Sequence, residues 1–225
     1  MGYWSFDGTG SIANNQTTGL RDESGRGNHG TASNANAVGM AFVPGRVGNA
    51  VTFDGVDDFV DAGNHPSLNL TSVGTISVWV RTHRNFPSDS AGMTHRGIIS
   101  KTIGGGGGQQ SFYLEWPGTN TTRNLRAEIG NATGVQGFWI SNFDFRTSWR
   151  NIVYTWNGSH HNLYIDGSFQ GQTAQTINAQ ISAAPLRIGV VFGLFAFWDG
   201  LIDEVRIYNR ALTEAEIRAN FNATR

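Results

Sequence analysis

Short alternations of apolar and polar residues recur along the chain and predict β-strands. The clearest is residues 74–81, where Ile76, Val78 and Val80 fall on one face of the strand. Turn dipeptides such as Asn157-Gly158 separate the runs. Further strands are expected at residues 2–6, 50–53, 58–61, 97–101, 111–116, 124–129, 137–142, 149–156, 161–165, 186–191 and 202–207. Such a series predicts an all-β fold, an antiparallel β-sandwich or jelly roll.

Two segments depart from this pattern. Residues 9–47 are rich in Gly, Asn, Ser and Asp, which predicts a long loop region with one short strand near residues 39–43. Near the other end, Thr213 and Glu216 stand in the spacing of a capping box and predict a short helix to about Asn220. No internal repeat is visible, so a single domain over residues 1–225 is the simplest organisation.

Composition narrows the function. The formal net charge is −1 and the Lys and Arg residues are interspersed, which gives no electrostatic footprint for nucleic acid. The chain has no cysteine, which excludes disulfides, thiol catalysis and zinc-thiolate sites.

No apolar run approaches the roughly 20 residues of a membrane span, and no signal-peptide pattern opens the chain. We expect no membrane insertion.

Two adjacent acids lie inside the last predicted strand. Burying an unpaired carboxylate is costly, so Asp203 and Glu204 each require a partner, whether a backbone amide, an arginine or a bound cation. Adjacent strand residues point to opposite faces. The two acids are therefore expected to have different partners.

Seven motifs, taken together and in this order, resemble the laminin-G-like jelly-roll family of the concanavalin A-like lectin/glucanase superfamily. They are residues 3–7 (YWSFD), 22–30 (DESGRGNHG), 45–50 (GRVGNA), 53–60 (FDGVDDFV), 76–80 (ISVWV), 163–167 (LYIDG) and 202–205 (IDEV). The resemblance runs from Tyr3 to Ile217. It implies two packed antiparallel sheets, one of them curved, with the first strand beside the last. It also implies a secreted or cell-surface protein, since the fold hosts lectins, polysaccharide-binding modules, adhesion domains and some glycan-cleaving enzymes.

The resemblance also implies a structural calcium ion near the N-terminal corner. Members of the family often bind Ca²⁺ there, and the matching oxygen-bearing residues of this chain are Asp7, Asp22, Asn28 and Asp203. The alternative is that Asp7 and Asp22 cap turns. In that case Asp203 or Glu204 would pair with an arginine, for which the candidates are Arg206, Arg46 and Arg26.

Strand parity predicts a polar and aromatic face suited to a sugar. If Phe112, Leu114, Leu125 and the other apolar residues point inward, the outward side chains are Tyr113, Glu115, Arg126, Glu128 and Trp139. The aromatic segment 195–198, with Trp198, is expected at the rim of this face. Aromatic rings stack on sugars, and planar polar groups bind their hydroxyls. The alternative is a patch covered by another domain or subunit.

Catalysis is the third interpretation. Glu115 and Glu128 are a conceivable carboxylate pair for glycoside cleavage. However, the strand motifs of the related retaining glucanases and of the similar alginate lyases are absent, which favours binding over catalysis. We therefore expect a non-catalytic module that binds a polysaccharide or glycan and holds a structural Ca²⁺. The alternatives are a structural or adhesive domain that binds protein, within a larger assembly, and a glycan-cleaving enzyme with an unfamiliar site.

Overall fold

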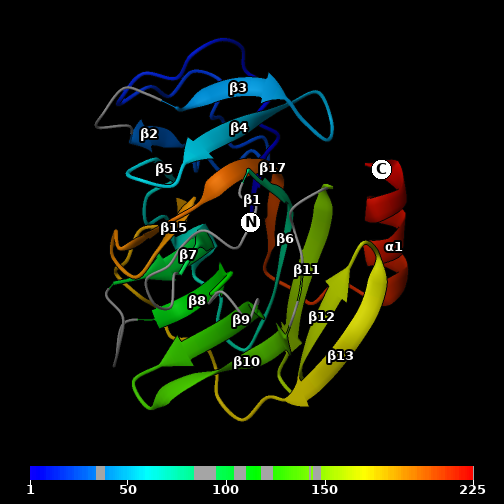
Figure 1. The fold of residues 1–225 in the computed structure, drawn as a ribbon. Helices are drawn as coiled ribbons and strands as arrows, with labels where there is room; N and C mark the ends of the chain where they lie inside the picture. The colour runs from blue at the N-terminus through cyan, green and yellow to red at the C-terminus, as the bar shows by residue number, and fades with distance from the viewer. Residues whose placement is uncertain are drawn as a thin grey trace.

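The computed structural model describes residues 1–33, 39–83, 95–103, 110–117, 124–141, 143 and 148–224. Within them the chain forms two antiparallel sheets packed against each other, with a helix near the C-terminus (Figure 1). The prediction of an all-β sandwich with a short C-terminal helix is confirmed.

The larger sheet has eight strands within the described residues, in the order β13-β12-β11-β6-β17-β4-β3, with β1 paired to β17. Its strands are β13 (Ser168–Ala174), β12 (His160–Ile165), β11 (Arg150–Asn157), β6 (Val73–Thr82), β17 (Asp199–Tyr208), β4 (Asn49–Asp54), β3 (Ala41–Pro44) and β1 (Gly2–Trp4).

The smaller sheet has seven strands in the described part of the chain, in the order β10-β9-β8-β7-β14-β5-β2. They are β10 (Gly134–Ser141), β9 (Asn124–Asn131), β8 (Gln110–Glu115), β7 (Gly97–Thr102), β14 (Arg187–Ile188), β5 (Phe59–Asp61) and β2 (Thr31–Ser33). A small hairpin of β15 (Val190–Val191) and β16 (Ala196–Phe197) packs against β7. A 3-10 turn, η1 (Pro66–Leu68), follows β5.

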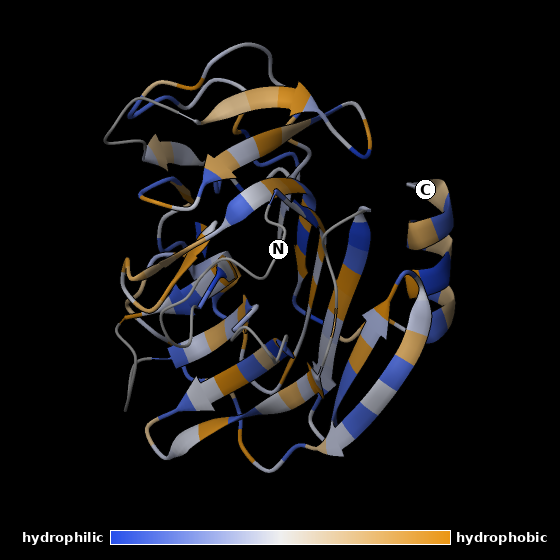
Figure 2. Ribbon diagram, in the orientation of Figure 1, coloured by the Kyte–Doolittle hydropathy of each residue, from blue (hydrophilic) through white to orange (hydrophobic). Residues whose placement is uncertain are grey.

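The core lies between the two sheets and follows the alternation in the sequence. Phe112 and Leu114 of β8 and Ile76 and Val78 of β6 are fully buried in one cluster. Bands of hydrophobic and hydrophilic colour alternate along the strands in Figure 2. Because successive side chains of a strand point to opposite faces, the same alternation leaves one face of each sheet for other contacts.

The first and last strands lie side by side, as expected. Tyr3 pairs with Arg206 and Trp4 with Val205. Within β17 the register shifts after Asp203, where Glu204 has a left-handed φ of 52°. Its buried carboxylate accepts the Tyr3 hydroxyl at 2.9 Å and pairs with the Arg206 guanidinium at 2.5 Å. The partner of Glu204 is therefore an arginine, and this bulge joins the two ends of the fold.

The helix α1 (Glu214–Ala223) covers the outer face of the larger sheet. Its capping box at Thr213 and Glu216 is present as predicted. The Phe221 ring stacks on Trp79 of β6 at 5.6 Å, while the Trp79 indole N–H donates to the Thr224 hydroxyl at 3.0 Å. Trp79 is thus covered by the helix.

Some elements were not predicted. β2 lies in the Gly- and Asn-rich segment where no alternation is visible, and β13 is a mostly exposed polar strand. The predicted strand at residues 186–191 is divided between β14 and β15, with Gly189 at a left-handed φ of 92° between them. Pairing to a neighbouring strand, rather than a continuous apolar face, defines β2 and β13, whereas β14 and β15 carry buried apolar residues and are separated at Gly189.

Candidate functional site

Five side chains gather on the outer face of β8, β9 and β10. They come from opposed positions on neighbouring strands, because Tyr113 pairs with Glu128, Glu115 with Arg126, and Arg126 with Trp139. The residues between them in sequence, such as Leu114 and Ala127, point into the core. The structure therefore brings together Tyr113, Glu115, Arg126, Glu128 and Trp139, which strand parity had placed on one face. We call these five residues the aromatic–carboxylate cluster.

Glu128 lies at the centre of the cluster and is buried. One carboxylate oxygen accepts the Tyr113 hydroxyl, and the other accepts the Trp139 indole N–H at 2.5 Å. Burial raises the pKa of Glu128 to about 7, although the hydrogen bond from Trp139 acts in the opposite direction. Near neutral pH this carboxyl group is therefore partly protonated.

Arg126 connects the remaining members. Its guanidinium donates to Glu115 Oε1 at 3.0 Å and lies over the Trp139 ring, 4.1 Å from the ring centre. His95 Nδ1 lies 2.8 Å from the other oxygen of Glu115, which is fully buried. Trp139 itself is 57% exposed. The Trp139 ring faces solvent but is held by one hydrogen bond and one stacked cation. It can therefore stack on a ligand without first being ordered.

Trp198 does not lie at the rim, which corrects the sequence-based expectation. It is fully buried in the core and packs near Trp116, with ring centres 6.3 Å apart. The run of apolar residues from 194 to 198 carries no alternation, so the sequence could not separate inward from outward positions. Phe195 is instead the exposed residue at the hairpin tip, at 86%. Phe192 of the same hairpin contacts Tyr113, with ring centres 5.3 Å apart.

Two of the predicted calcium ligands, Asp22 and Asn28, lie together near β1. The Asp22 carboxylate accepts the N–H groups of Tyr3, Ser24 and Asn28 at 2.9–3.0 Å, and also the Asn28 side-chain amide at 2.9 Å. Burial alone would raise the pKa of Asp22, but these hydrogen bonds lower it below its usual value. Both oxygens are thus engaged by protein donors.

The other two, Asp203 and Asp7, hold one turn between β3 and β4. Asp203 Oδ2 accepts the N–H groups of Arg46 and Val47 at 2.8 and 3.0 Å, and Asp7 Oδ1 accepts the Asn49 N–H at 2.8 Å. Burial raises the pKa of Asp203 to about 7 despite these two amides. The structure therefore places the four residues as two pairs, each of which secures a loop.

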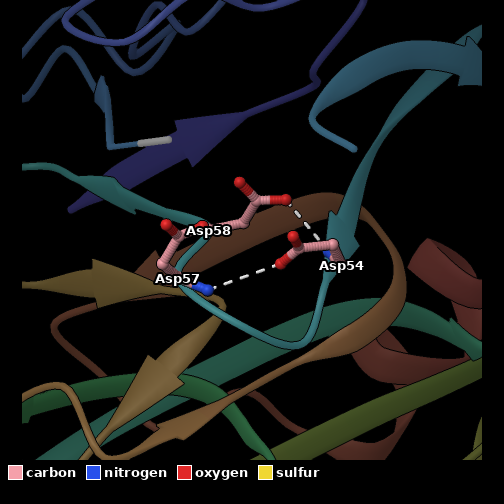
Figure 3. A group of neighbouring side chains, drawn as sticks. All are labelled: Asp54, Asp57 and Asp58. Atoms are coloured by element: carbon pink, nitrogen blue, oxygen red, sulfur yellow. Dashed lines mark hydrogen bonds between the residues drawn. The ribbon is translucent and has the colours of Figure 1, made fainter. Parts of the chain in front are cut away.

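A group of three carboxylates lies elsewhere, in the turn between β4 and β5. One oxygen each from Asp54, Asp57 and Asp58 falls within 4.8 Å of the others (Figure 3). Asp58 is fully buried; one of its oxygens accepts the Asp54 N–H at 2.9 Å. Among the described residues, the buried Oδ1 atoms of Asp57 and Asp58 have no hydrogen-bond partner. Such a set of hard oxygen donors could hold a metal ion. The signal that sequence reasoning missed is the Asp-Gly-Val-Asp-Asp turn.

Within the described residues, no helix has the length and apolar content to cross a membrane. A family model for Laminin_G_3, described as the concanavalin A-like lectin/glucanases superfamily, matches residues 54–218. This match includes the aromatic–carboxylate cluster and the Asp54–Asp58 turn. A search of curated proteins finds no match.

Several solved structures share the fold. Domain 4 of AbnA, a GH43 extracellular arabinanase from Geobacillus stearothermophilus in complex with arabinotriose, is 19% identical with a TM-score of 0.63, covering 97% of this chain and 96% of that one. The botulinum neurotoxin serotype G binding domain is 18% identical with a TM-score of 0.66, covering 93% of this chain and 50% of that one.

A third structure is the botulinum neurotoxin serotype D ligand binding domain in complex with N-acetylneuraminic acid. It is 14% identical with a TM-score of 0.63, covering 97% of this chain and 51% of that one. This chain thus spans about half the length of the toxin domains. At these identities the likeness establishes the fold alone.

Proposed function

The chain belongs to the concanavalin A-like lectin/glucanases superfamily, and we propose that it is a non-catalytic carbohydrate-binding module of a secreted or surface protein. The observation that carries the proposal is Trp139, an exposed ring fixed by Glu128 and Arg126 on the outer face of the smaller sheet. Sugars present flat C–H faces that stack on such rings. Because the Trp139 ring is already fixed, binding of a sugar does not cost the conformational entropy of ordering this side chain.

The burial of the two acids favours binding over glycan cleavage. A glycosidase needs two carboxyl groups that reach the scissile bond from either side. Here Glu115 and Glu128 are both buried, and their oxygens bind Arg126, His95, Tyr113 and Trp139. We infer that they position Arg126 and Trp139 rather than contact a substrate.

The similar structures support the ligand class. One is an arabinanase domain in complex with arabinotriose, and another is a toxin domain in complex with N-acetylneuraminic acid. Both are domains of larger proteins, and the arabinanase is extracellular. These likenesses are too distant to transfer a particular sugar, so the proposal is limited to a glycan.

We also propose that a structural Ca²⁺ binds this module. The convergence of three carboxylates within 4.8 Å, two of them with an unpartnered oxygen, favours the Asp54–Asp58 turn as its place. The corner formed by Asp7, Asp22, Asn28 and Asp203 remains the sequence-based alternative. Asp203 Oδ1 is likewise buried there without a hydrogen-bond partner among the described residues. Asp203 Oδ2, Asp7 Oδ1 and both oxygens of Asp22 already accept N–H groups, which a cation would have to displace or share.

A glycan array with purified protein tests the main proposal. We expect binding to a restricted set of glycans, and at least about a tenfold loss of affinity in Trp139→Ala, which corresponds to about 1.4 kcal/mol. The matched control is Phe169→Ala, because Phe169 is also a partly exposed aromatic residue but lies on β13 of the other sheet. Equal binding by Trp139→Ala and wild type would contradict the assignment of Trp139.

The second candidate is an adhesive domain that binds protein. The exposed Phe195 and Leu194 at the hairpin tip favour it, since neighbouring exposed apolar residues often mark contact surfaces. An array without any signal would leave this candidate as the better one. Turnover of a polysaccharide that is lost in Glu115→Gln would instead indicate an enzyme.

A further inference from the structure

A cavity of about 640 Å³ lies at the opposite end of the same sheet from Trp139. It is formed by the outer side of β2 and β5 together with the loops that follow β5 and precede β2. Because Ala32 and Val60 pair and point into the core, their neighbours Thr31, Ser33 and Asp61 point outward and line the cavity. Its volume lies within the usual range of small-ligand sites, roughly 300–1,000 Å³.

One row of paired residues connects the cavity with the aromatic–carboxylate cluster. The row crosses the sheet from strand to strand through Glu128, Tyr113, Ser100, Arg187, Asp61 and Thr31. At about 4.8 Å per strand, Tyr113 and Thr31 are roughly 19 Å apart along it. The β15–β16 hairpin covers the middle, where the Ser100 hydroxyl donates to the Val190 carbonyl at 2.8 Å. The face therefore has two separate open regions.

Two histidines of the cavity present a fixed hydrogen-bond donor. His29 Nδ1 accepts the backbone N–H of Asp22 at 3.1 Å, and His65 Nδ1 accepts that of Ser67 at 3.2 Å. A backbone N–H can only donate, so each Nδ1 is unprotonated. The proton of each neutral imidazole therefore resides on Nε2, where it can be donated to a ligand.

Asn64 and Asp61 complete the polar lining. The buried Lys101 ammonium donates to Asn64 Oδ1, so the Asn64 amide retains its NH₂ group as a donor. Asp61 accepts the Gly63 N–H at 2.8 Å and the Arg187 guanidinium at 3.3 Å. The negative charge of Asp61 is thereby balanced, which disfavours a strongly charged ligand. The Phe59 side chain is 9% exposed and lies against the Arg187 guanidinium, so it adds only a small apolar surface beside these groups.

We propose that this cavity is a second saccharide-binding site, specific for a neutral, hydroxyl-rich sugar unit. The inference rests on the proposed glycan-binding function and extends it, because one module then engages two sugar units at two places on one sheet face. Amide, imidazole and hydroxyl groups around one small aromatic surface match the alternating hydroxyl and C–H surfaces of a neutral sugar. A polysaccharide long enough to reach both sites gains affinity from their combined occupancy.

Calorimetry on single-site variants tests the proposal. Ser33→Leu narrows the cavity without removing a hydrogen bond that the described residues make, and Ser168→Leu on β13 is the matched control. The probes are arabinotriose and the neutral array oligosaccharide that binds wild type most tightly. We expect two sugars per wild-type chain, one per chain for Ser33→Leu and for Trp139→Ala, and none for the double variant. Ser168→Leu should retain two.

Nuclear magnetic resonance of ¹⁵N-histidine-labelled Trp139→Ala gives an independent readout. Addition of the same oligosaccharide should shift the Nε2 resonances of His29 and His65, and Ser33→Leu should abolish these shifts. If Trp139→Ala binds no sugar while wild type binds one, the second site is overturned and the proposed function stands. Wild-type binding to acidic glycans alone would overturn the neutral specificity. If wild type binds no glycan at all, the proposed function itself fails.

Discussion

The Trp139 indole N–H donates to Glu128 at 2.5 Å, which makes a buried acid the support of the most exposed tryptophan described on the sheet. The other oxygen of Glu128 binds Tyr113, so one carboxyl group ties β8, β9 and β10 together. The orientation of the exposed Trp139 ring is thus set by a buried side chain. A substitution of Glu128 should therefore alter ligand affinity, although Glu128 itself does not contact the ligand.

The first prediction concerns the pH dependence contributed by Glu128. Its folded-state pKa is about 7, above the ordinary 4.5, because burial disfavours the charged form. The contribution of this group to stability is therefore fully present below pH 4.5 and is lost as the pH rises through 7. Glu128→Gln stays neutral, so its free energy of unfolding should rise relative to wild type between pH 5 and 8, by up to about 3 kcal/mol.

Denaturant unfolding at several pH values measures this difference. The control is Glu214→Gln, which changes a half-exposed carboxylate on α1 that pairs with Arg218 and should alter the free energy of unfolding by less than about 1 kcal/mol. A Glu128→Gln difference that does not change with pH would show that the carboxyl group is ionised without penalty in the fold.

The outer face of β8–β10 could be predicted from the sequence because each strand has a clear period of two. Phe112 and Leu114 fixed the inward side of β8, so the outward positions of Tyr113 and Glu115 followed. The partners across the strands did not follow, because strand register is set by turns and long-range pairing. Trp198 was misplaced for a related reason, since its run of apolar neighbours gives no period.

The cavity and the acidic turn could not be predicted from the sequence, because both depend on contacts between segments that are distant in the chain. The cavity depends on β2, which lies in a segment without apolar alternation and is held by its pairing to β5 and by backbone hydrogen bonds between Ala32 and residues 15 and 16. The sequence places Asp54 and Asp57 between the strands predicted at residues 50–53 and 58–61, and the motif at residues 53–60 indicates the family rather than a metal site. Asp58 is fully buried because of the tertiary packing around the turn. The local sequence carries no signal of this burial.

The second prediction locates the proposed Ca²⁺. At calcium concentrations of about 100 Kd, binding should stabilise wild type by about 2.7 kcal/mol, which raises the melting temperature by roughly 5–10 °C for a chain of this size. Asp58→Asn should remove this calcium-dependent increment, while Asp22→Asn should retain it. The measurement is a melting scan in EDTA and in added calcium. An increment lost in Asp22→Asn and kept in Asp58→Asn would move the ion to the N-terminal corner; no increment in wild type would refute the site.

The third prediction tests the contact between α1 and the larger sheet. Phe221→Ala removes the ring that stacks on Trp79 at 5.6 Å, and should lower the free energy of unfolding by about 1–3 kcal/mol. Arg218→Ala on the same helix removes only an exposed pair with Glu214, and should cost less than about 0.5 kcal/mol. Glycan binding should persist in both, because the helix lies on the face away from Trp139. Equal stability of the two variants would mean that the helix is not held by this stack.

The fourth prediction uses Lys101, the single lysine of the chain, which is fully buried. Its ammonium donates to Asn64 and to the carbonyls of Ser182 and Ala184, and burial lowers its pKa to about 8. The unprotonated amine is the reactive form and is present in part at pH 8, so burial and these three hydrogen bonds are what protect the group in the folded protein. We expect an amine-reactive ester to leave Lys101 unmodified in the native protein and to modify it after unfolding in guanidinium, as measured by peptide mass mapping.

Arg218→Lys supplies an exposed lysine on α1 as the internal control, since Arg218 is largely exposed. Native-state modification of Lys101 as fast as that of Lys introduced at position 218 would show that the support of Asn64, and with it one wall of the cavity, is not formed.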